Sequence, residues 1–397
     1  KKTGEYMTLK SSFSRCPIII LLQGLEIMLE IYLSIYFVIF ILIWNLCIIG
    51  NSKELKETMP FSGFCICILI LVVGLRWNTG TDWQSYKNLF DKINLNNINS
   101  IQHFDVGYKW FNLIIKFFTD DYSVLLLFDA LLSITLIHFA LKKIQVNTLI
   151  CILIFYIDFC IAHYFGSNRR IIAMGFVFVQ FVYIFLGKYK RALLCCFLAF
   201  IFHRSSIVSI FAFLIPKRGF STKKYFFILF SCLILGATGV LFDIILVVVE
   251  KINLPQLSLL KSVLHYLKYG KNDTEQMTLI HYILASCKRF LFLFLILYFN
   301  KKTKQKSNLF NYFFNLYICS ICAYFLLSKV SIFQILSTYF AMSEIVLWGI
   351  IFYNANLKHK KILLITLLFI GIIQVQNSFP MYKNLYIPYI STLSKYG

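Results

Sequence analysis

Three groups of polar side chains interrupt a chain that is otherwise strongly apolar. Guanidinium groups bind phosphate oxygens through paired hydrogen bonds. An imidazole or a carboxylate can accept the proton of a hydroxyl group near neutral pH. Together these residue types could bind an anionic group and activate a hydroxyl. The three groups are Arg76 with Asp82, the pair Arg169 and Arg170, and His203 with Arg204.

The pair Arg169 and Arg170 lies in GSNRR (166–170), where the sequence predicts the start of a helix. Asn168 is predicted to cap this helix, which places both arginines on its first turn. A helix N-terminus carries partial positive charge and disfavours arginine. An anion bound to the free N–H groups removes this penalty, so the pair predicts a phosphate or diphosphate site. The simpler alternative is that both arginines reach out to lipid headgroups.

The stretch VVGLRWNTGTDWQSY (72–86) predicts a second helix start. TDWQ fits a capping box in which Thr81 caps the helix and Gln84 reaches back, and Gly80 permits a tight turn before it. Asp82 is either a carboxylate beside a substrate or an ordinary acid at a helix start. Three aromatic residues could stack on sugar rings or belong to an interfacial belt: Trp77, Trp83 and Tyr86.

The composition of the chain indicates that membrane helices position these polar groups. Of the 397 residues, 59% are hydrophobic and 14% are charged, whereas a soluble domain has about 25% charged residues. We predict an all-α polytopic membrane protein with about ten to twelve transmembrane or re-entrant helices. The predicted segments are 31–49, 61–75, 122–141, 148–165, 169–187, 191–215, 224–249, 279–299, 309–327, 332–353 and 362–377, with an amphipathic element at 104–118.

Lysine and arginine in short loops predict the orientation of these segments. Such loops also account for much of the net charge of +22, so nucleic acid is not an expected partner. The loops near 76–121 and 250–278 are predicted to lie outside. The loops predicted to face the cytoplasm are 141–143, 188–191, 216–224, 301–306 and 358–361.

The segment 192–215 has a basic loop at each end, so a single crossing would leave one of them outside. We therefore predict a hairpin bent at FHRSS (202–206). Each arm has about 12 residues and a length of about 18 Å, which is too short to cross a membrane. The hairpin would be re-entrant, and its bend would lie on the same outer side as Arg76 and Arg169.

The remaining features set the domain organisation. Residues 1–27 are interpreted as a leader or extra N-terminal segment, and residues 28–397 as one membrane domain. Most of the 12 cysteines lie in apolar runs, where cysteine behaves as a small apolar residue. Neither zinc-ligand spacing nor a phosphate-binding glycine loop occurs, so no metal or other cofactor is expected.

Four motifs in order carry a family resemblance. They are GLRWNTGTDWQSY (74–86), FDVGYKWF (104–111), NRRIIA (168–173) and FHRSSI (202–207). They resemble the Gly-Leu-Arg to Gly-Thr-Asp, acidic-x-Gly-Tyr, Arg-Gln-x-x-Ala and His-x-Ser elements of the Wzy-type O-antigen and polysaccharide polymerases, in the EpsG-like branch. There are two departures. Arg170 replaces the usual Gln, and FQILSTYF (333–340) has Gln334 but no arginine before its Tyr-Phe pair.

The resemblance implies a GT-C-like membrane glycosyltransferase that needs no metal and acts at the periplasmic face of the bacterial inner membrane, in O-antigen or lipopolysaccharide synthesis. Such an enzyme polymerises oligosaccharide repeat units linked to undecaprenyl diphosphate, adding the growing chain to the non-reducing end of the next unit. A chain-length regulator protein is a candidate partner. Two alternatives remain open: a flippase or exporter of lipid-linked oligosaccharides, and a membrane sugar acyltransferase.

The resemblance also assigns roles to the residues described above. Fixed arginines stabilise the charge of a departing lipid diphosphate. The residues assigned to this role are Arg76 and Arg169, with Arg170 and Arg204 as second choices. The base or orienting group for the acceptor hydroxyl is His203 or Asp82.

Overall fold

The computed structural model describes residues 30–31, 33–50, 55–101, 103–238, 240, 244, 247, 279–303, 307–328, 331–379 and 383–395. In these ranges the chain folds into helices, and the only β pairing is an isolated bridge between Arg76 and Ser391. The protein is therefore an all-α polytopic membrane protein, as the sequence predicts. The predicted leader (1–27) and the predicted external loop 250–278 lie outside the described residues.

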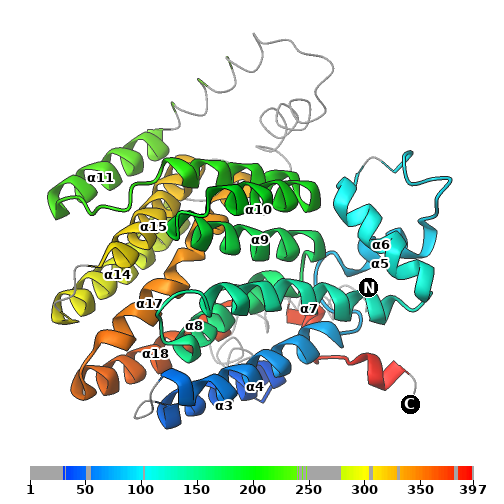
Figure 1. Ribbon diagram of the computed structural model, residues 1–397, viewed down its shortest axis with the longest axis horizontal. Helices are drawn as coiled ribbons and strands as arrows, with labels where there is room; N and C mark the ends of the chain where they lie inside the picture. Colours follow the sequence, from blue (N-terminus) through cyan, green and yellow to red (C-terminus); the bar gives the residue numbers. More distant parts are fainter. Residues whose placement is uncertain are drawn as a thin grey trace, which may run out of the picture.

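The helices form a bundle from which one pair projects at the side (Figure 1). The projecting pair is α5 (Trp83–Lys92) and α6 (Val106–Phe118). The first part of the bundle contains α3 (Ile35–Ile49), α4 (Leu55–Gly74), α7 (Tyr122–Leu141), α8 (Thr148–Ile154), the π-helix η2 (Phe155–Tyr164) and α9 (Asn168–Phe185). The later part contains α10 (Tyr189–Phe202), the 3₁₀-helix η3 (Arg204–Leu214), α11 (Thr222–Thr238), α14 (Leu279–Thr303), α15 (Asn308–Leu326), α16 (Ser331–Ala341), α17 (Ser343–Asn354) and α18 (Leu357–Asn377).

Six of the described helical segments are long and apolar enough to cross a membrane. They coincide with predicted segments because runs of about 20 apolar residues suit a bilayer core. The six are Tyr122–Leu141, Asn168–Phe185, Tyr282–Lys302, Asn308–Leu326, Phe333–Asn354 and Leu357–Asn377. Short 3₁₀-helices, η4 (Lys383–Leu385) and η5 (Thr392–Lys395), follow α18.

The predicted hairpin at 192–215 is confirmed. His203 has an extended backbone between α10 and η3. Cys196 Sγ on the first arm lies 3.7 Å from Ser209 Oγ on the second, so the arms fold back on each other. Gln180 of α9 donates to the Ser209 carbonyl at 2.9 Å and fixes the second arm against the bundle.

The basic loops gather at one end of the bundle. Lys143 lines a surface depression together with Leu186 and Ser307, and Lys217 lies over the ring of Tyr189. These residues lie in or beside four of the five loops that the charge pattern assigned to one side, so these four loops share one end of the bundle. That this end faces the cytoplasm stays a prediction. We call the opposite end, where α9 begins and the hairpin bends, the distal end.

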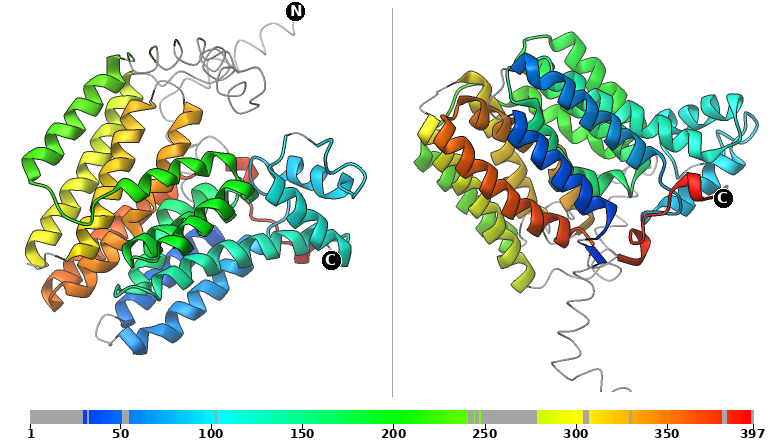
Figure 2. Two further views of the ribbon diagram at one scale, coloured as in Figure 1. Left: turned by 45° about the horizontal axis from the view of Figure 1, so that its top comes forward. Right: turned by 90° about the horizontal axis from the view of Figure 1, so that it is seen from below.

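The C-terminal segment returns to the distal end beside the loop after α4 (Figure 2). The N–H of Trp77 donates to the Ile390 carbonyl at 2.8 Å, and that of Thr392 to the Leu75 carbonyl at 2.7 Å. The loop that carries Arg76 is thus fixed by residues from the far end of the sequence.

Candidate functional site

One carboxylate joins the polar residues at the distal end. Asp105 Oδ2 accepts a hydrogen bond from Arg169 Nη1 at 2.9 Å and lies 3.3 Å from His203 Nδ1. Asp105 Oδ1 lies 3.2 Å from Arg204 Nε. We call these four residues the Asp105 cluster. The structure therefore brings together Arg169, His203 and Arg204, which the sequence placed on one side of the membrane.

Local structure explains why Asp105 reaches this position. It is the N-cap residue of α6, but its side chain caps no backbone N–H and points instead to α9. A Cβ on Gly107 would lie 2.9 Å from the Ile201 carbonyl oxygen, so glycine lets α6 approach the end of α10 just before His203. We did not count Asp105 among the site residues from the sequence. Its signal was the acid that opens the FDVGYKWF motif.

The charges of the cluster determine the protonation of Asp105 and His203. Burial alone raises the pKa of Asp105, but the His203 hydrogen bond and the Arg169 and Arg204 cations lower it below its usual 3.8. Burial lowers the pKa of His203 below 6.5, the Asp105 hydrogen bond opposes this, and Arg169 and Arg170 add to the lowering. His203 is therefore neutral at pH 7. With Nδ1–H donating to Asp105, its Nε2 keeps a free lone pair.

Arg76 lies apart from this cluster and is 1% exposed. Its guanidinium donates to the Asn168 side chain and to the Val73 carbonyl. The prediction that Asn168 caps α9 is wrong, because Ser167 is the N-cap residue and the Asn168 side chain is committed to Arg76. Arg76 thus holds the start of α9, which carries Arg169.

Helix α5 also begins differently from the prediction. Asp82 occupies the N-cap position without a side-chain capping bond, and Gln84 donates to Asn88 rather than reaching back. The predicted capping box with Thr81 is therefore wrong. The exposed Asp82 side chain remains available to the solvent beside the bundle.

The three aromatic candidates pack against other rings. The Trp83 ring lies 4.9 Å from that of Trp77, and the Tyr86 ring 5.4 Å from that of Tyr108. Trp83 and Tyr86 are buried, and the Tyr86 hydroxyl lies 3.0 Å from Ser167 Oγ. Trp83 and Tyr86 therefore pack within the α5–α6 projection, whereas Trp77, in the loop after α4, is half-buried, and its stacking on a sugar stays a prediction.

Gly80 is required at the turn before α5. Its φ is +100°, and a Cβ there would lie 1.7 Å from the Phe165 carbonyl oxygen. We expect Gly80→Ala to destabilise the protein by at least about 1–3 kcal/mol, the usual cost of a strained backbone position. Thermal unfolding in detergent measures this. Gly63→Ala is the matched control, because a Cβ at Gly63 meets nothing within 4 Å. Equal unfolding temperatures for the two variants would contradict the prediction.

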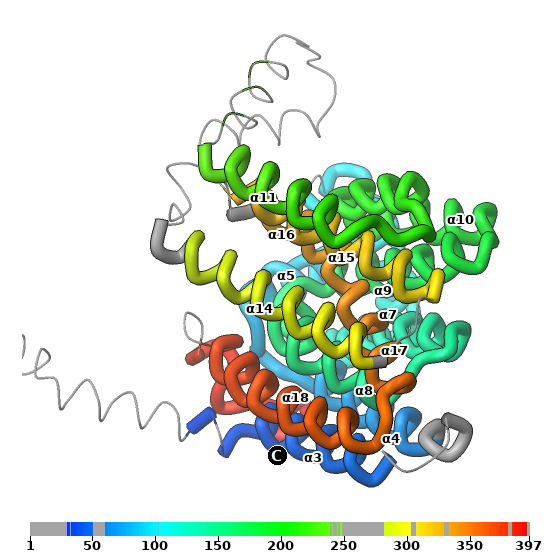
Figure 3. The backbone as a smooth tube through the Cα atoms, turned by 90° about the vertical axis from the view of Figure 1, so that its left-hand side faces the viewer, coloured from blue at the N-terminus to red at the C-terminus, as the bar shows by residue number. Residues whose placement is uncertain are grey.

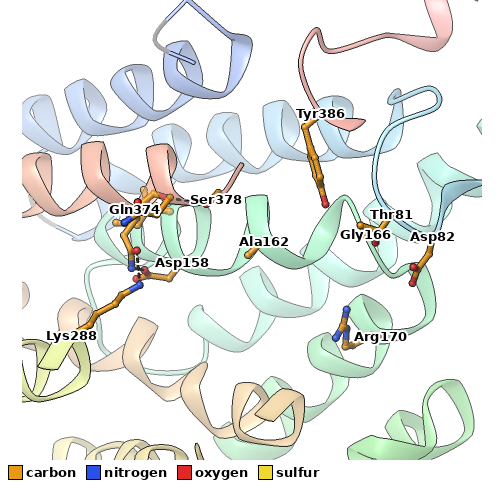
Figure 4. Close-up of a pocket in the computed structure, with 12 residues that line it drawn as sticks. Thr81, Asp82, Asp158, Ala162, Gly166, Arg170, Lys288, Gln374, Ser378 and Tyr386 are labelled. Atoms are coloured by element: carbon orange, nitrogen blue, oxygen red, sulfur yellow. Dashed lines mark hydrogen bonds between the residues drawn. The ribbon is translucent and has the colours of Figure 1, made fainter. Parts of the chain in front are cut away.

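A polar cavity of about 570 Å³ lies beside Arg170, the residue that follows Arg169 of the Asp105 cluster (Figure 4). Arg170 and Asp82 line one end, together with Tyr386 of the C-terminal segment. Asp158 and Lys288 line the other end, and Ala162 lies between the two ends. The balanced charges, hydroxyls and amides of this lining suit a polar ligand that carries both sugar and anionic groups.

At the end of the cavity that Asp158 and Lys288 line, a chain of hydrogen bonds joins three helices. Lys288 Nζ of α14 donates to Gln374 Oε1 of α18 at 2.7 Å, and Gln374 Nε2 donates to Asp158 Oδ1 of η2 at 2.5 Å. A second cavity of about 190 Å³ continues from these residues towards Arg289 and Glu344. π-Helical turns such as η2 occur often at functional sites. The sequence signal that we did not use was Lys288 and Arg289, two cations inside an apolar span.

The Asp105 cluster and the polar cavity are adjacent because two consecutive arginines of α9 belong to one each. Arg169 turns to Asp105, whereas Arg170 lines the cavity. Among the described residues, no hydrogen bond or ion pair occupies the Arg170 guanidinium. Tyr339 of α16 extends the arrangement, since its hydroxyl lies 2.9 Å from Ser205 Oγ at the hairpin bend.

A family model provides the decisive comparison. The model of the EpsG family matches residues 59–391, which span all the motifs described above. The chain belongs to the EpsG family. Members of this family are Wzy-like polymerase-type membrane proteins, so the EpsG assignment indicates a glycosyltransferase-type polymerase in general terms. No curated protein and no solved structure is significantly similar to this chain.

The EpsG family assignment and the geometry concern the same residues. Asp105, Arg169 and His203 come from three of the motifs and form direct contacts. Arg76, from the first motif, contacts the third through Asn168. In this EpsG-family protein the motifs thus form one connected distal site with two different surfaces, the Asp105 cluster and the polar cavity.

Proposed function

We propose that this protein polymerises oligosaccharide repeat units linked to undecaprenyl diphosphate, at the periplasmic face of the bacterial inner membrane. The observation that carries the proposal is the contact of His203 Nδ1 with Asp105 at 3.3 Å, which orients the imidazole beside Arg170, an arginine that lines the polar cavity. This arrangement places a base and an anion-binding group next to each other. The family assignment supports the same class of reaction.

The proposed step is a single glycosyl transfer. A hydroxyl oxygen of the acceptor sugar forms a bond to the anomeric carbon of the donor chain. The bond between that carbon and the diphosphate oxygen breaks, and its electron pair leaves with undecaprenyl diphosphate. The hydroxyl proton passes to His203 Nε2, because Nδ1 already donates to the Asp105 carboxylate.

The arginines have two different roles in the proposed step, stabilising the leaving anion and positioning other residues. Arg170 lines the cavity and stabilises the negative charge of the departing diphosphate. The Arg204 side chain, 39% exposed, is a second group for that anion. Arg169 acts as a positioning residue because it holds Asp105, and Arg76 acts further back by holding the start of α9. Asp82 at the cavity end accepts hydrogen bonds from sugar hydroxyls.

Reconstitution tests the proposed function. The purified protein is placed in vesicles with a lipid-linked repeat unit, and the products are separated by length. A ladder of lengthened glycans is the expected result. Unchanged repeat units carried across the membrane would instead support the flippase alternative, and an acylated repeat unit would support the acyltransferase. Either result would overturn the proposal.

The pH dependence of the transfer rate gives a separate prediction. A general base must be neutral, and the pKa of His203 is lowered below 6.5. The rate should therefore fall as the pH decreases, and the midpoint of this acid limb should lie below pH 6.5. Initial rates in vesicles measure the profile. His203→Gln should be slow and lack this acid limb, and an unchanged limb in that variant would contradict the role of His203.

A further inference from the structure

The end of the polar cavity that Lys288 and Gln374 line, which we call its inner end, lies between α14 and α18, and both helices are on the face shown in Figure 3. On α14, Lys288 lies four residues after Leu284 and three before Leu291, so the three share one helix face. Leu284 is 62% exposed and Leu291 is 55% exposed. The cavity lysine therefore belongs to the outward apolar face of its helix.

The same relation holds on α18. Asn377 lines the cavity and follows Ile373 by four residues and Phe369 by eight, which places them on one face. Phe369 is 61% exposed and Ile373 is 56% exposed. On a membrane helix, such exposed apolar side chains contact lipid tails. Both walls of the cavity thus continue onto surfaces that face the membrane, which we call the lipid-facing stripes.

The polar residues on these faces need an explanation. A lysine within an apolar span is costly, and such residues usually mark a pathway or a binding site. Lys288 lies in the candidate span Tyr282–Lys302, and its amine donates to Gln374 of the facing helix. A polar opening between two apolar faces suits an amphiphile with its head in the cavity and its tail in the membrane.

We propose that the space between α14 and α18 is a lateral opening through which a polyprenyl diphosphate-linked sugar reaches the site. The sugars enter first, so the diphosphate that follows them contacts Lys288 at the opening and then Arg170 at the far end of the cavity, with the sugars ahead of it. The polyprenyl tail lies along the lipid-facing stripes. The identity of the headgroup rests on the proposed function, whereas the position of the opening rests on the exposed faces of the two helices.

Photocrosslinking tests this opening without requiring glycosyl transfer. The probe is a polyprenyl diphosphate with a diazirine in its first isoprene units, added to the full chain in nanodiscs. We expect labelled peptides from α14 and α18. Lys288→Gln should reduce labelling about tenfold or more, because a charge-assisted hydrogen bond is lost. Lys302→Gln, at the opposite end of α14, is the matched control and should leave labelling unchanged.

A second variant guards against misfolding of the first. Asn377→Asp adds a negative charge at an exposed position and should also weaken labelling. Labelling spread evenly over all lipid-facing helices, or insensitive to both variants, would overturn the proposal. So would full protection by inorganic diphosphate alone at the concentration of the probe, since the site would then bind a soluble anion. A glycan ladder with labelling elsewhere would reject the opening but keep the polymerase.

Discussion

Replacing Arg170 by alanine should reduce the rate of glycan polymerisation about 10²–10³-fold, while the protein keeps its unfolding temperature. Arg170 lines the polar cavity and, among the described residues, has no hydrogen-bond or ion-pair partner to lose. Its removal therefore breaks no hydrogen bond or ion pair within the described residues. It takes away one fixed donor for the departing diphosphate, and the loss of one such donor typically costs this much in rate.

The matched control for this prediction is Arg191→Ala. Arg191 is an exposed arginine among the basic loops at the other end of the bundle, so its loss removes the same charge far from the cavity. Chain-length ladders and initial rates in vesicles are the measurements. If Arg170→Ala polymerised at the rate of Arg191→Ala, the cavity would not hold the diphosphate.

The second large effect concerns Asp105. Asp105→Asn keeps the size of the side chain but removes the charge that faces His203, Arg169 and Arg204. His203 then loses the carboxylate that holds its proton on Nδ1. The proton can instead occupy Nε2, which then has no lone pair to accept the hydroxyl proton. We expect the rate to fall on the order of 10²–10⁴-fold, the usual contribution of general acid–base catalysis.

A pH profile separates this positioning role from a loss of folding. The acid limb of the residual activity of Asp105→Asn should shift to lower pH, because the hydrogen bond and the charge of Asp105 raise the pKa of His203 in the native protein. Asp91→Asn is the control, because Asp91 forms an exposed ion pair with Lys87 at 2.6 Å, and such pairs contribute little to stability. A native acid limb in Asp105→Asn would show that Asp105 does not orient the base.

The fold could be predicted well from the sequence because a membrane-spanning helix needs a run of about 20 apolar residues, which is visible in the composition of each segment. The apolar run 122–141 became α7 (Tyr122–Leu141) without a shift of its ends. The hairpin also followed from charge, since no single crossing allows basic loops at both ends of 192–215 to share a side. Boundaries that depend on one side chain failed, as at Asn168, because a tertiary partner, Arg76, competed for the capping group.

The site could be predicted only in part. The positions of Arg169, His203 and Arg204 at one end follow from topology, but their common partner, Asp105, does not. Contacts between distant segments have no local signature, so a buried arginine and a ligand-facing arginine look alike in the sequence. Arg76 and Arg170 differ for this reason: one is enclosed by protein, and the other lines a cavity.

The backbone pairing between the Arg76 loop and the C-terminal segment has a consequence for biosynthesis. The ribosome makes Leu75 and Trp77 early, but their partners Thr392 and Ile390 emerge only after every transmembrane helix described here has been made. The Arg76 loop therefore lacks these two backbone hydrogen bonds until the C-terminal segment has been made. The backbone pairing that fixes the Arg76 loop can therefore form only after the described transmembrane helices have been made.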